Sequence, residues 1–390
     1  MLTIKYKRTM AYKGYNRPNV PRDPTNEEFV LSFTLDEVES GSAGSFFEEF
    51  GFVVIRDVLS KEEIEASVDD VWSYLESGAW RNTMFSNKSN PVANKFWSED
   101  NRKGPDRNIP HQWDACWPNM ENEGILGAPP VFTKQAFLNR QNPNVIKVFT
   151  KLLNTNKLIV NIDRYGLFRP TINVDLFGDG TVFKNKPMWE TDPNLHLDVN
   201  PWEYYAEVAE PPKSIDYARA FPSKLSHLPT FCEEHNATGH SSAPGNQIRL
   251  QALLNFIDNR EQDGGFQLVP GFHKHLEQWA HRTRDTLGKY KRFGSFNVLP
   301  SSDPIHQYAE RITMPAGSLL VWDIRLPHGS KPNHSDRPRM AQFLKYFPAP
   351  PKGTFKQRKE IVEAKLEQSG IGDDLTATGR KLFGLEDYDD

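Results

Sequence analysis

The stretch AGSLLVWDIRLPHGSKPNHSDRPR, residues 316–339, predicts two strands joined by a loop. Its SLLVWD run (318–323) is apolar and β-rich, as expected of a buried strand. A short loop follows and presents His328, and eleven residues later Arg339 opens a second predicted strand, RMAQFLKYF (339–347). The stretch therefore places a histidine and an arginine close to the ends of predicted strands.

Similar runs occur along the rest of the chain, separated by clusters of Gly, Pro, Asn and Asp. They are GFVVIRDV (51–58), KLIVNIDRYGLF (157–168), NLHLDV (194–199), QIRLQALLNFID (247–258), FQLVP (266–270) and RITMP (311–315). Helical periodicity lies mostly before and between them, at 142–153, 273–290, 354–369 and after Ser60, which with Glu63 forms a capping box. Strands without βαβ alternation predict a mainly β fold with flanking helices, either an antiparallel sandwich or a jelly roll.

Composition excludes several classes of protein. The 390 residues carry 47 basic and 51 acidic side chains, a net charge of −4, which gives no electrostatic footprint for nucleic acid or an anionic membrane. Two cysteines are too few for a disulfide scaffold and fit a reducing compartment. The sequence has no apolar signal-peptide core and no membrane-length apolar run. We therefore expect a cytoplasmic protein with a small-molecule substrate and no obligate protein partner.

His196 and Asp198 form the first candidate site. In a strand they would share one face, about 7 Å apart along the chain. Considered alone, this pair fits a structural ion pair as well as a metal site. A second histidine from a distant strand would complete the facial triad of two histidines and one carboxylate that is typical of non-haem Fe(II) oxygenases. Arg339 could then clamp a carboxylate, as binding of 2-oxoglutarate would require.

The residues around these positions resemble a known family. The stretches are FFEEFGFVVIRDVLSKEEIE (46–65), HLD (196–198), DGGFQLVPGFHKH (263–275), MPAGSLLVWD (314–323) and HGSKPNHSDRPR (328–339). In them the chain resembles the phytanoyl-CoA dioxygenase-like branch of the Fe(II)/2-oxoglutarate-dependent oxygenases. The resemblance implies a cupin-like double-stranded β-helix, with Fe(II) as cofactor and 2-oxoglutarate and O₂ as co-substrates. It also implies His196, Asp198 and His328 as iron ligands, Arg339 and Ser330 at the 2-oxoglutarate carboxylate, and Trp202 beside the co-substrate.

The reaction implied by this resemblance is oxidation of a C–H bond of a small molecule, with release of succinate and CO₂. The outcome would be hydroxylation, with desaturation and oxidative cyclisation as alternatives. Two other functions stay open at this stage. One is a metal-dependent hydrolase with the same ligands, which gives no reason for Arg339, and the other is a non-catalytic small-molecule-binding protein of the same fold.

Three segments are expected along the chain. They are an N-terminal arm (1–44), an oxygenase domain (45–350) and a C-terminal helix with an acidic tail (351–390). Two insertions, at about 80–130 and 203–246, depart from the family pattern and are expected to shape the substrate pocket. Their candidate substrate contacts are His111, Trp113 and Tyr204, joined by Arg169 at a predicted strand end. The alternatives are that these aromatics pack the loop and that Arg169 is a surface or salt-bridged residue.

Overall fold

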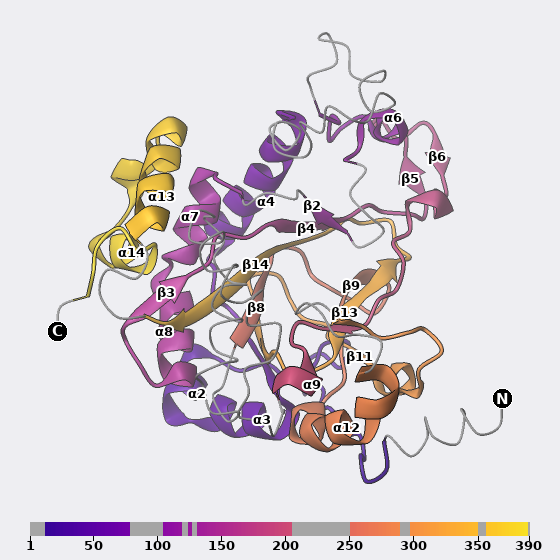
Figure 1. The fold of residues 1–390 in the computed structure, drawn as a ribbon. Coiled ribbons are helices and arrows are strands. Elements are labelled where there is room, and N and C mark those ends of the chain that lie inside the picture. The colour runs from indigo at the N-terminus through magenta and orange to yellow at the C-terminus, as the bar shows by residue number, and fades with distance from the viewer. Residues whose placement is uncertain are drawn as a thin grey trace.

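The three strands between residues 319 and 348 belong to two different sheets of the computed structural model (Figure 1). β12 (Leu319–Asp323) and β14 (Arg339–Pro348) lie in a seven-stranded sheet, whereas β13 (His328–Asn333) lies in a five-stranded sheet. The structure describes residues 12–78, 104–118, 124–126, 131–204, 250–288, 297–349 and 356–388. The chain thus crosses from the larger sheet to the smaller one and returns.

The larger sheet has the strand order β1-β12-β8-β14-β4-β2, and β3 pairs with the far end of β14. All of these pairs are antiparallel. The remaining strands of this sheet are β1 (Phe52–Ile55), β2 (Ile125–Leu126), β3 (Leu158–Val160), β4 (Tyr165–Phe168) and β8 (Leu250–Asn255). β8 is central and buried along its whole length, so its amide side chains, Gln251 and Asn255, lie in the interior.

The smaller sheet has the strand order β10-β7-β13-β9-β11 and is also antiparallel. Its other strands are β7 (His196–Leu197), β9 (Asp263–Leu268), β10 (Asn297–Val298) and β11 (Glu310–Arg311). A separate hairpin pairs β5 (Val174–Asp175) with β6 (Phe183–Lys184). The ring centroid of Phe266 in β9 lies 4.3 Å from that of Trp322 in β12. The seven-stranded and five-stranded sheets therefore pack against each other.

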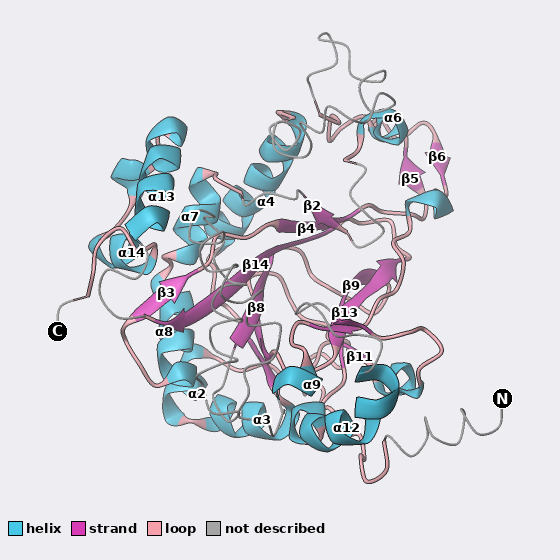
Figure 2. Ribbon diagram, in the orientation of Figure 1, coloured by secondary structure: helices cyan, strands magenta, loops and turns pink. Residues whose placement is uncertain are grey.

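Helices flank the two sheets (Figure 2). Their bounds are α2 (Leu35–Ser40), α3 (Ser42–Phe50), α4 (Lys61–Glu76), α6 (Trp113–Cys116), α7 (Lys134–Arg140), α8 (Pro143–Leu153), α9 (Pro201–Tyr204), α12 (Leu276–Thr283), α13 (Lys356–Ser369) and α14 (Ala377–Leu382). On α8, the ring of Phe149 stacks on that of Tyr346 in β14 at 4.1 Å. Because neighbouring residues of a strand point to opposite faces, Lys345 points away from this helix, into the space between the sheets.

Most predicted elements are confirmed. α4 begins after Ser60, whose hydroxyl accepts a hydrogen bond from the Glu63 N–H, while the Glu63 carboxylate accepts one from the Ser60 N–H. Such a cap contributes about 1 kcal/mol to the stability of a helix. The predicted strands at 51–58, 247–258 and 318–323 contain β1, β8 and β12, and those at 266–270 and 339–347 overlap β9 and β14.

Five predictions differ from the structure. The predicted strand 194–199 is reduced to the two residues of β7, and 311–315 to the end of β11. The run 157–168 is two strands, β3 and β4, that pair with β14 at different places. The predicted helix 273–290 is divided into a 3₁₀ turn, α12 and a π turn over Arg284–Gly288. His328 lies at the start of β13 rather than on a loop, and its strand, HGSKPN, contains the Gly and Pro that suggested a turn.

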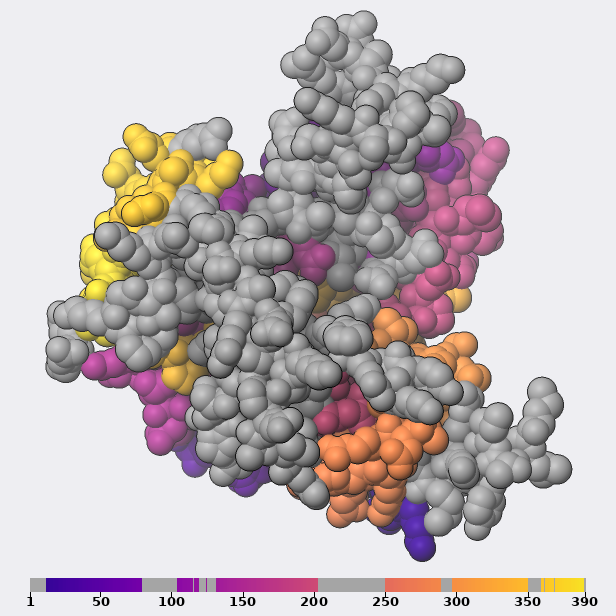
Figure 3. Space-filling view, in the orientation of Figure 1, coloured from indigo at the N-terminus to yellow at the C-terminus, as the bar shows by residue number. Residues whose placement is uncertain are grey.

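The N-terminal residues that the structure describes pack on the rest of the molecule. The ring of Tyr15 lies 5.2 Å from that of Phe272, and Phe33 forms a parallel bridge with Ile55 of β1. At the other end, Phe383 packs 4.6 Å from Phe137 of α7. The C-terminal helices and α12 lie at opposite margins of the face shown in Figure 3. None of the described helices has the length and apolarity of a membrane span, and the three-segment division stays a prediction.

Candidate metal centre

Two neighbouring strands of the smaller sheet bring His196 and His328 together. The two residues are direct partners across β7 and β13, and their ring centroids lie 4.5 Å apart. Asp198 follows two residues after His196, with Oδ1 3.7 Å from His196 Nε2 and Oδ2 3.8 Å from His328 Nε2. One ligand atom from each of the three residues lies within 4.8 Å of the other two. The structure therefore gathers the predicted ligands at one point between the sheets.

Hydrogen bonds to the other ring nitrogens fix the orientation of both imidazoles. His328 Nδ1 lies 2.9 Å from the Leu326 carbonyl oxygen, which can only accept a hydrogen bond. The proton must then be on Nδ1, so Nε2 keeps a lone pair that points toward Asp198. His196 Nδ1 lies 3.1 Å from Asn194 Oδ1, an equivalent contact. Histidines that bind metals are commonly oriented by such acceptors.

The electrostatic environment favours the protonation states that metal binding needs. Burial, followed by the neighbouring His328, lowers the pKa of His196 to about 3, and burial also lowers the pKa of His328. Burial acts to raise the pKa of Asp198, but the Lys345 ammonium is the largest of several effects that bring it below its usual range. Both imidazoles are therefore neutral and the carboxylate is ionised near neutral pH, as ligands of a cation must be.

Three further side chains around Asp198 were not found from the sequence. Gln251 Nε2 donates a hydrogen bond to Asp198 Oδ2, and Lys345 Nζ lies 3.6 Å from the same oxygen. Trp322 Nε1 donates to Gln251 Oε1 at 2.9 Å. The sequence contained two signals for them. Gln251 is a polar residue within an apolar strand, and Lys345 lies an even number of residues after Arg339 and so shares a face of its strand with it.

Arg339 lies at the start of β14, opposite Phe168 of β4, and is 3% exposed. A Cβ added to Gly166 would lie 3.0 Å from its Nη1, and one added to Gly265 would lie 3.2 Å from its Nε, so these glycines make room for the guanidinium. Its Nε is buried and has no hydrogen-bond partner among the described residues. Burial, followed by the nearby Arg311, lowers its pKa to about 10, and the group stays charged near neutral pH.

Ser330 and Trp202 have contacts other than those predicted. Ser330 Oγ accepts a hydrogen bond from Asn194 Nδ2 at 2.8 Å, which connects it to His196 through Asn194. Trp202 donates its indole N–H to Thr283 Oγ1 at 3.0 Å, and its ring lies 5.6 Å from that of Trp279, so it packs on α12. The roles assigned to Ser330 and Trp202 in co-substrate binding stay predictions.

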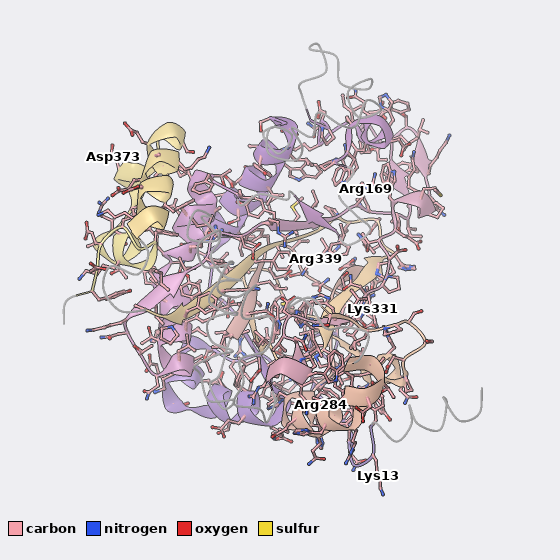
Figure 4. All side chains as sticks on the ribbon, viewed as in Figure 1. Lys13, Arg169, Arg284, Lys331, Arg339 and Asp373 are labelled. Carbon is pink, nitrogen blue, oxygen red and sulfur yellow. The ribbon has the colours of Figure 1, made fainter. Side chains whose placement is uncertain are left out.

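The described contacts of the candidate substrate residues are with aromatic rings rather than with the metal triad. Trp113 packs with three other indoles, and we call the four the tryptophan cluster (Trp72, Trp113, Trp117 and Trp189). The Arg169 guanidinium lies 5.0 Å from the Trp117 ring centroid and 4.8 Å from that of Trp189. His111 is exposed, with its ring 4.9 Å from that of Phe177. Figure 4 shows Arg339 beside β4 and β14 and Arg169 nearer α6.

The remaining pocket predictions fall mainly on residues outside the described ranges. Nearly all of the 203–246 insertion, including the side chain of Tyr204, lies outside them, as does most of the 80–130 insertion. The parts of the 80–130 insertion that the structure describes include α6 with Trp113, and Trp117 of the tryptophan cluster. The substrate roles of His111, Trp113, Arg169 and Tyr204 stay predictions.

The residues present fit an Fe(II) centre with 2-oxoglutarate. Two neutral imidazoles and one carboxylate are the donor set of non-haem Fe(II) oxygenases, and both imidazoles are oriented through Nδ1. Arg339 is a buried cation whose Nε has no acceptor among the residues described, and a carboxylate would satisfy it. The site thus offers donors for a metal and a cation for a dicarboxylate.

Comparison with known proteins identifies the family. A family model described as "Phytanoyl-CoA dioxygenase (PhyH)" matches residues 234–341. A Dictyostelium discoideum protein described as "Putative phytanoyl-CoA dioxygenase" is 31% identical over 382 residues, which cover 92% of this chain and 96% of that protein.

Two solved structures share the fold at low identity. GlcNAc Inducible Gene 2 (GIG2, DUF1479) from Candida albicans matches with a TM-score of 0.57 and 13% identity, over 100% of this chain and 84% of that one. The "Putative Oxidoreductase" from Salmonella typhimurium LT2 matches with a TM-score of 0.53 and 12% identity, over 98% of this chain and 91% of that one. Given the identity and coverage of the Dictyostelium relative, the chain belongs to the phytanoyl-CoA dioxygenase family, a family of oxidoreductases that use Fe(II) and 2-oxoglutarate.

Proposed function

We propose that this protein is an Fe(II)/2-oxoglutarate-dependent dioxygenase that oxidises a C–H bond of a small molecule and releases succinate and CO₂. The observation that carries the proposal is the combination of the His196, Asp198 and His328 triad with the buried Arg339, whose Nε has no hydrogen-bond partner among the described residues. The two antiparallel sheets packed face to face support a double-stranded β-helix as the core of the fold.

In this proposal His196 Nε2, His328 Nε2 and a carboxylate oxygen of Asp198 hold the metal. When bound, Fe(II) supplies the oxidising chemistry with 2-oxoglutarate and O₂, while the protein supplies ligands, orientation and exclusion of water. Asn194 and the Leu326 carbonyl keep both imidazoles in the tautomer that offers Nε2. These contacts hold both imidazoles in the orientation that metal binding needs.

Arg339 would bind the far carboxylate of 2-oxoglutarate. Removing one partner of a buried ion pair costs about 3–5 kcal/mol, because the other charge is left without compensation. Arg339 is buried and its Nε has no hydrogen-bond partner among the described residues, so a bound carboxylate would supply one. It shares the inner face of β14 with Lys345, which lies beside Asp198. The same interior face therefore offers both the metal end and the carboxylate end of a co-substrate site.

A hydrolase that used the same ligands would activate a metal-bound water. Such an enzyme would have no use for Arg339, whose burial without an anion is costly. A non-catalytic binding protein would not need two oriented imidazoles and an ionised carboxylate. The oxygenase accounts for all four residues.

The test is release of succinate from 2-oxoglutarate by the purified protein with Fe(II), in the presence of a metabolite library. We expect slow succinate release without substrate and faster release with one compound, whose mass would increase by one oxygen or decrease by two hydrogens. Binding of 2-oxoglutarate to the Mn(II)-loaded protein, measured by calorimetry, gives a readout that does not depend on turnover. Absence of both succinate and 2-oxoglutarate binding would overturn the proposal.

A further inference from the structure

Three adjacent strands of the larger sheet present a row of side chains to Asp198. Gln251 in β8 is the direct partner of Trp322 in β12 and of Lys345 in β14. Direct partners in an antiparallel sheet point to the same face, with Cβ atoms about 5 Å apart. Asp198 faces this row from the side of the smaller sheet, whose strands β7 and β13 carry His196 and His328. The metal centre is therefore built by both sheets, although its ligands come from one of them.

The contacts that the structure describes from this row to Asp198 are made to Oδ2. Gln251 Nε2 donates a hydrogen bond to Asp198 Oδ2, and Lys345 Nζ lies 3.6 Å from that oxygen. The indole N–H of Trp322 can only donate, so Gln251 must accept it through Oε1 and turn its NH₂ group toward Asp198. The orientation of the amide is thus set by Trp322, whose ring is held between Phe266 and His328 at 4.3 Å and 5.3 Å.

We propose that Gln251 and Lys345 are positioning residues that hold Asp198 Oδ2, so that the carboxylate binds the metal through Oδ1 alone. Oδ1 lies 3.7 Å from His196 Nε2 and Oδ2 lies 3.8 Å from His328 Nε2, so both oxygens are within reach of a metal and the contacts to Oδ2 can decide which one binds it. A carboxylate bound through both oxygens would fill an additional coordination position. The triad would then leave too few open positions for a chelating 2-oxo acid and O₂. This inference rests on the proposed function, because it assigns a purpose to the open positions.

Lys345 contributes charge as well as geometry. It is 14% exposed, so its ammonium interacts with Asp198 with little screening by solvent. A purely structural alternative is that Lys345 only compensates buried carboxylates. It also lies close enough to the buried Asp163 to act on that carboxylate. The two roles predict different effects of removing Lys345. Loss of a structural counter-ion would change stability but not how the metal is coordinated, whereas loss of a positioning residue would change the coordination.

The test compares full-length wild type with Gln251→Leu, Lys345→Met and Trp322→Phe, loaded with Co(II), whose absorption spectrum reports coordination number and geometry. Lys331→Met is the matched control, since Lys331 is a part-buried lysine of β13 with no described carboxylate in salt-bridge range (Figure 4). Loss of a group that orients a ligand typically weakens metal binding by about 10–100-fold. We expect that weakening in Gln251→Leu and Lys345→Met, together with a changed Co(II) spectrum and a smaller effect in Trp322→Phe.

Lys345→Arg should restore part of the affinity, because it keeps the charge near Oδ2. Unchanged Co(II) affinity and spectrum in Gln251→Leu and Lys345→Met, with or without a lower melting temperature, would overturn the inference. If Lys345→Met does not fold, Gln251→Leu and Trp322→Phe decide the matter, because neither removes a charge. A wild-type protein that binds Co(II) but neither binds 2-oxoglutarate nor releases succinate would instead contradict the proposed function.

Discussion

The metal centre and the tryptophan cluster both hold charged side chains in the interior, but they stabilise them by different contacts. Around Asp198, polar atoms are directed at one another, and the neighbouring imidazoles are fixed through Nδ1. In the tryptophan cluster, Arg169 lies over the faces of Trp117 and Trp189. Directed polar contacts fix atoms for a ligand, whereas ring faces attract a cation with much weaker directional requirements.

Arg339 and Arg169 differ in the same way in the contacts of their guanidinium groups. Both lie near aromatic rings, and Arg339 is 5.3 Å from the centroid of Phe168. Only Arg339, however, has a nitrogen that is both buried and without a partner among the described residues. Arg169 is part-exposed and is not among the described residues with a buried, unpartnered nitrogen. An unsatisfied buried donor is thus a stronger indication of a binding site than a cation among aromatic side chains.

The largest effect is expected from Asp198→Ala. It removes the only carboxylate of the triad, and we expect loss of stoichiometric Fe(II) binding and of all iron-dependent succinate release. The protein should stay folded but lose some stability, because Lys345 loses one nearby carboxylate while Asp163 still acts on it. Metal content and melting temperature measure the two effects. Retained iron with normal turnover would show that Asp198 is not a ligand.

Arg339→Ala should come next. We expect the dissociation constant for 2-oxoglutarate to rise at least about 100-fold, since 3–5 kcal/mol corresponds to two or more orders of magnitude. Metal affinity should not change, because Arg339 contacts none of the triad residues. Arg339→Lys keeps the charge but not the two-pronged geometry, so it should recover only part of the binding. Unaltered 2-oxoglutarate affinity in Arg339→Ala would exclude this assignment.

The longer strands could be predicted from the sequence because they depend on local patterns, whereas the three residues of the triad were implied by the family resemblance. β12 and β14 are long apolar runs, and the HxD spacing places two ligands together even though β7 is only two residues long. β13 was not predicted because its sequence, HGSKPN, has neither alternation nor β-branched residues. It is a strand because its neighbours, β7 and β9, provide hydrogen-bond partners on both sides.

The residues around Asp198 could not be predicted for a different reason. Gln251 and Lys345 are 94 positions apart in the sequence, and only the pairing of β8 with β14 makes them neighbours. No motif marks a glutamine whose orientation depends on an indole in another strand. The aromatic composition of the loop around Trp113 suggested a pocket wall. Aromatic rings that only pack on one another have the same composition, so the sequence could not distinguish the two.

Trp113→Ala should separate packing from substrate binding. Trp113 is 3% exposed and lies within the tryptophan cluster, so its loss should lower the free energy of unfolding by about 3 kcal/mol. Affinity for 2-oxoglutarate at a temperature where the variant is folded should match that of wild type. Chemical denaturation and calorimetry measure these quantities. Unchanged stability, with loss of substrate-coupled turnover and retention of uncoupled decarboxylation, would instead favour the pocket wall expected from the sequence.

The smallest effect is expected from Arg169→Met, which keeps most of the apolar side chain and removes the charge. Two cation–π contacts at a part-buried site contribute about 1–2 kcal/mol, and methionine regains part of this through sulfur–aromatic contacts. We therefore expect the free energy of unfolding to fall by about 1 kcal/mol, with unchanged affinity for Fe(II) and 2-oxoglutarate.

Arg169→Lys should lose less stability than Arg169→Met, because an ammonium still interacts with the indole faces. Arg164→Met is the comparison variant, since Arg164 lies at the other end of β4 and pairs with Asp163 at 3.2 Å instead of with aromatic rings. If Arg169→Met left stability unchanged but raised the KM for the substrate, Arg169 would be a substrate contact, and the contrast between the two arginines would fail.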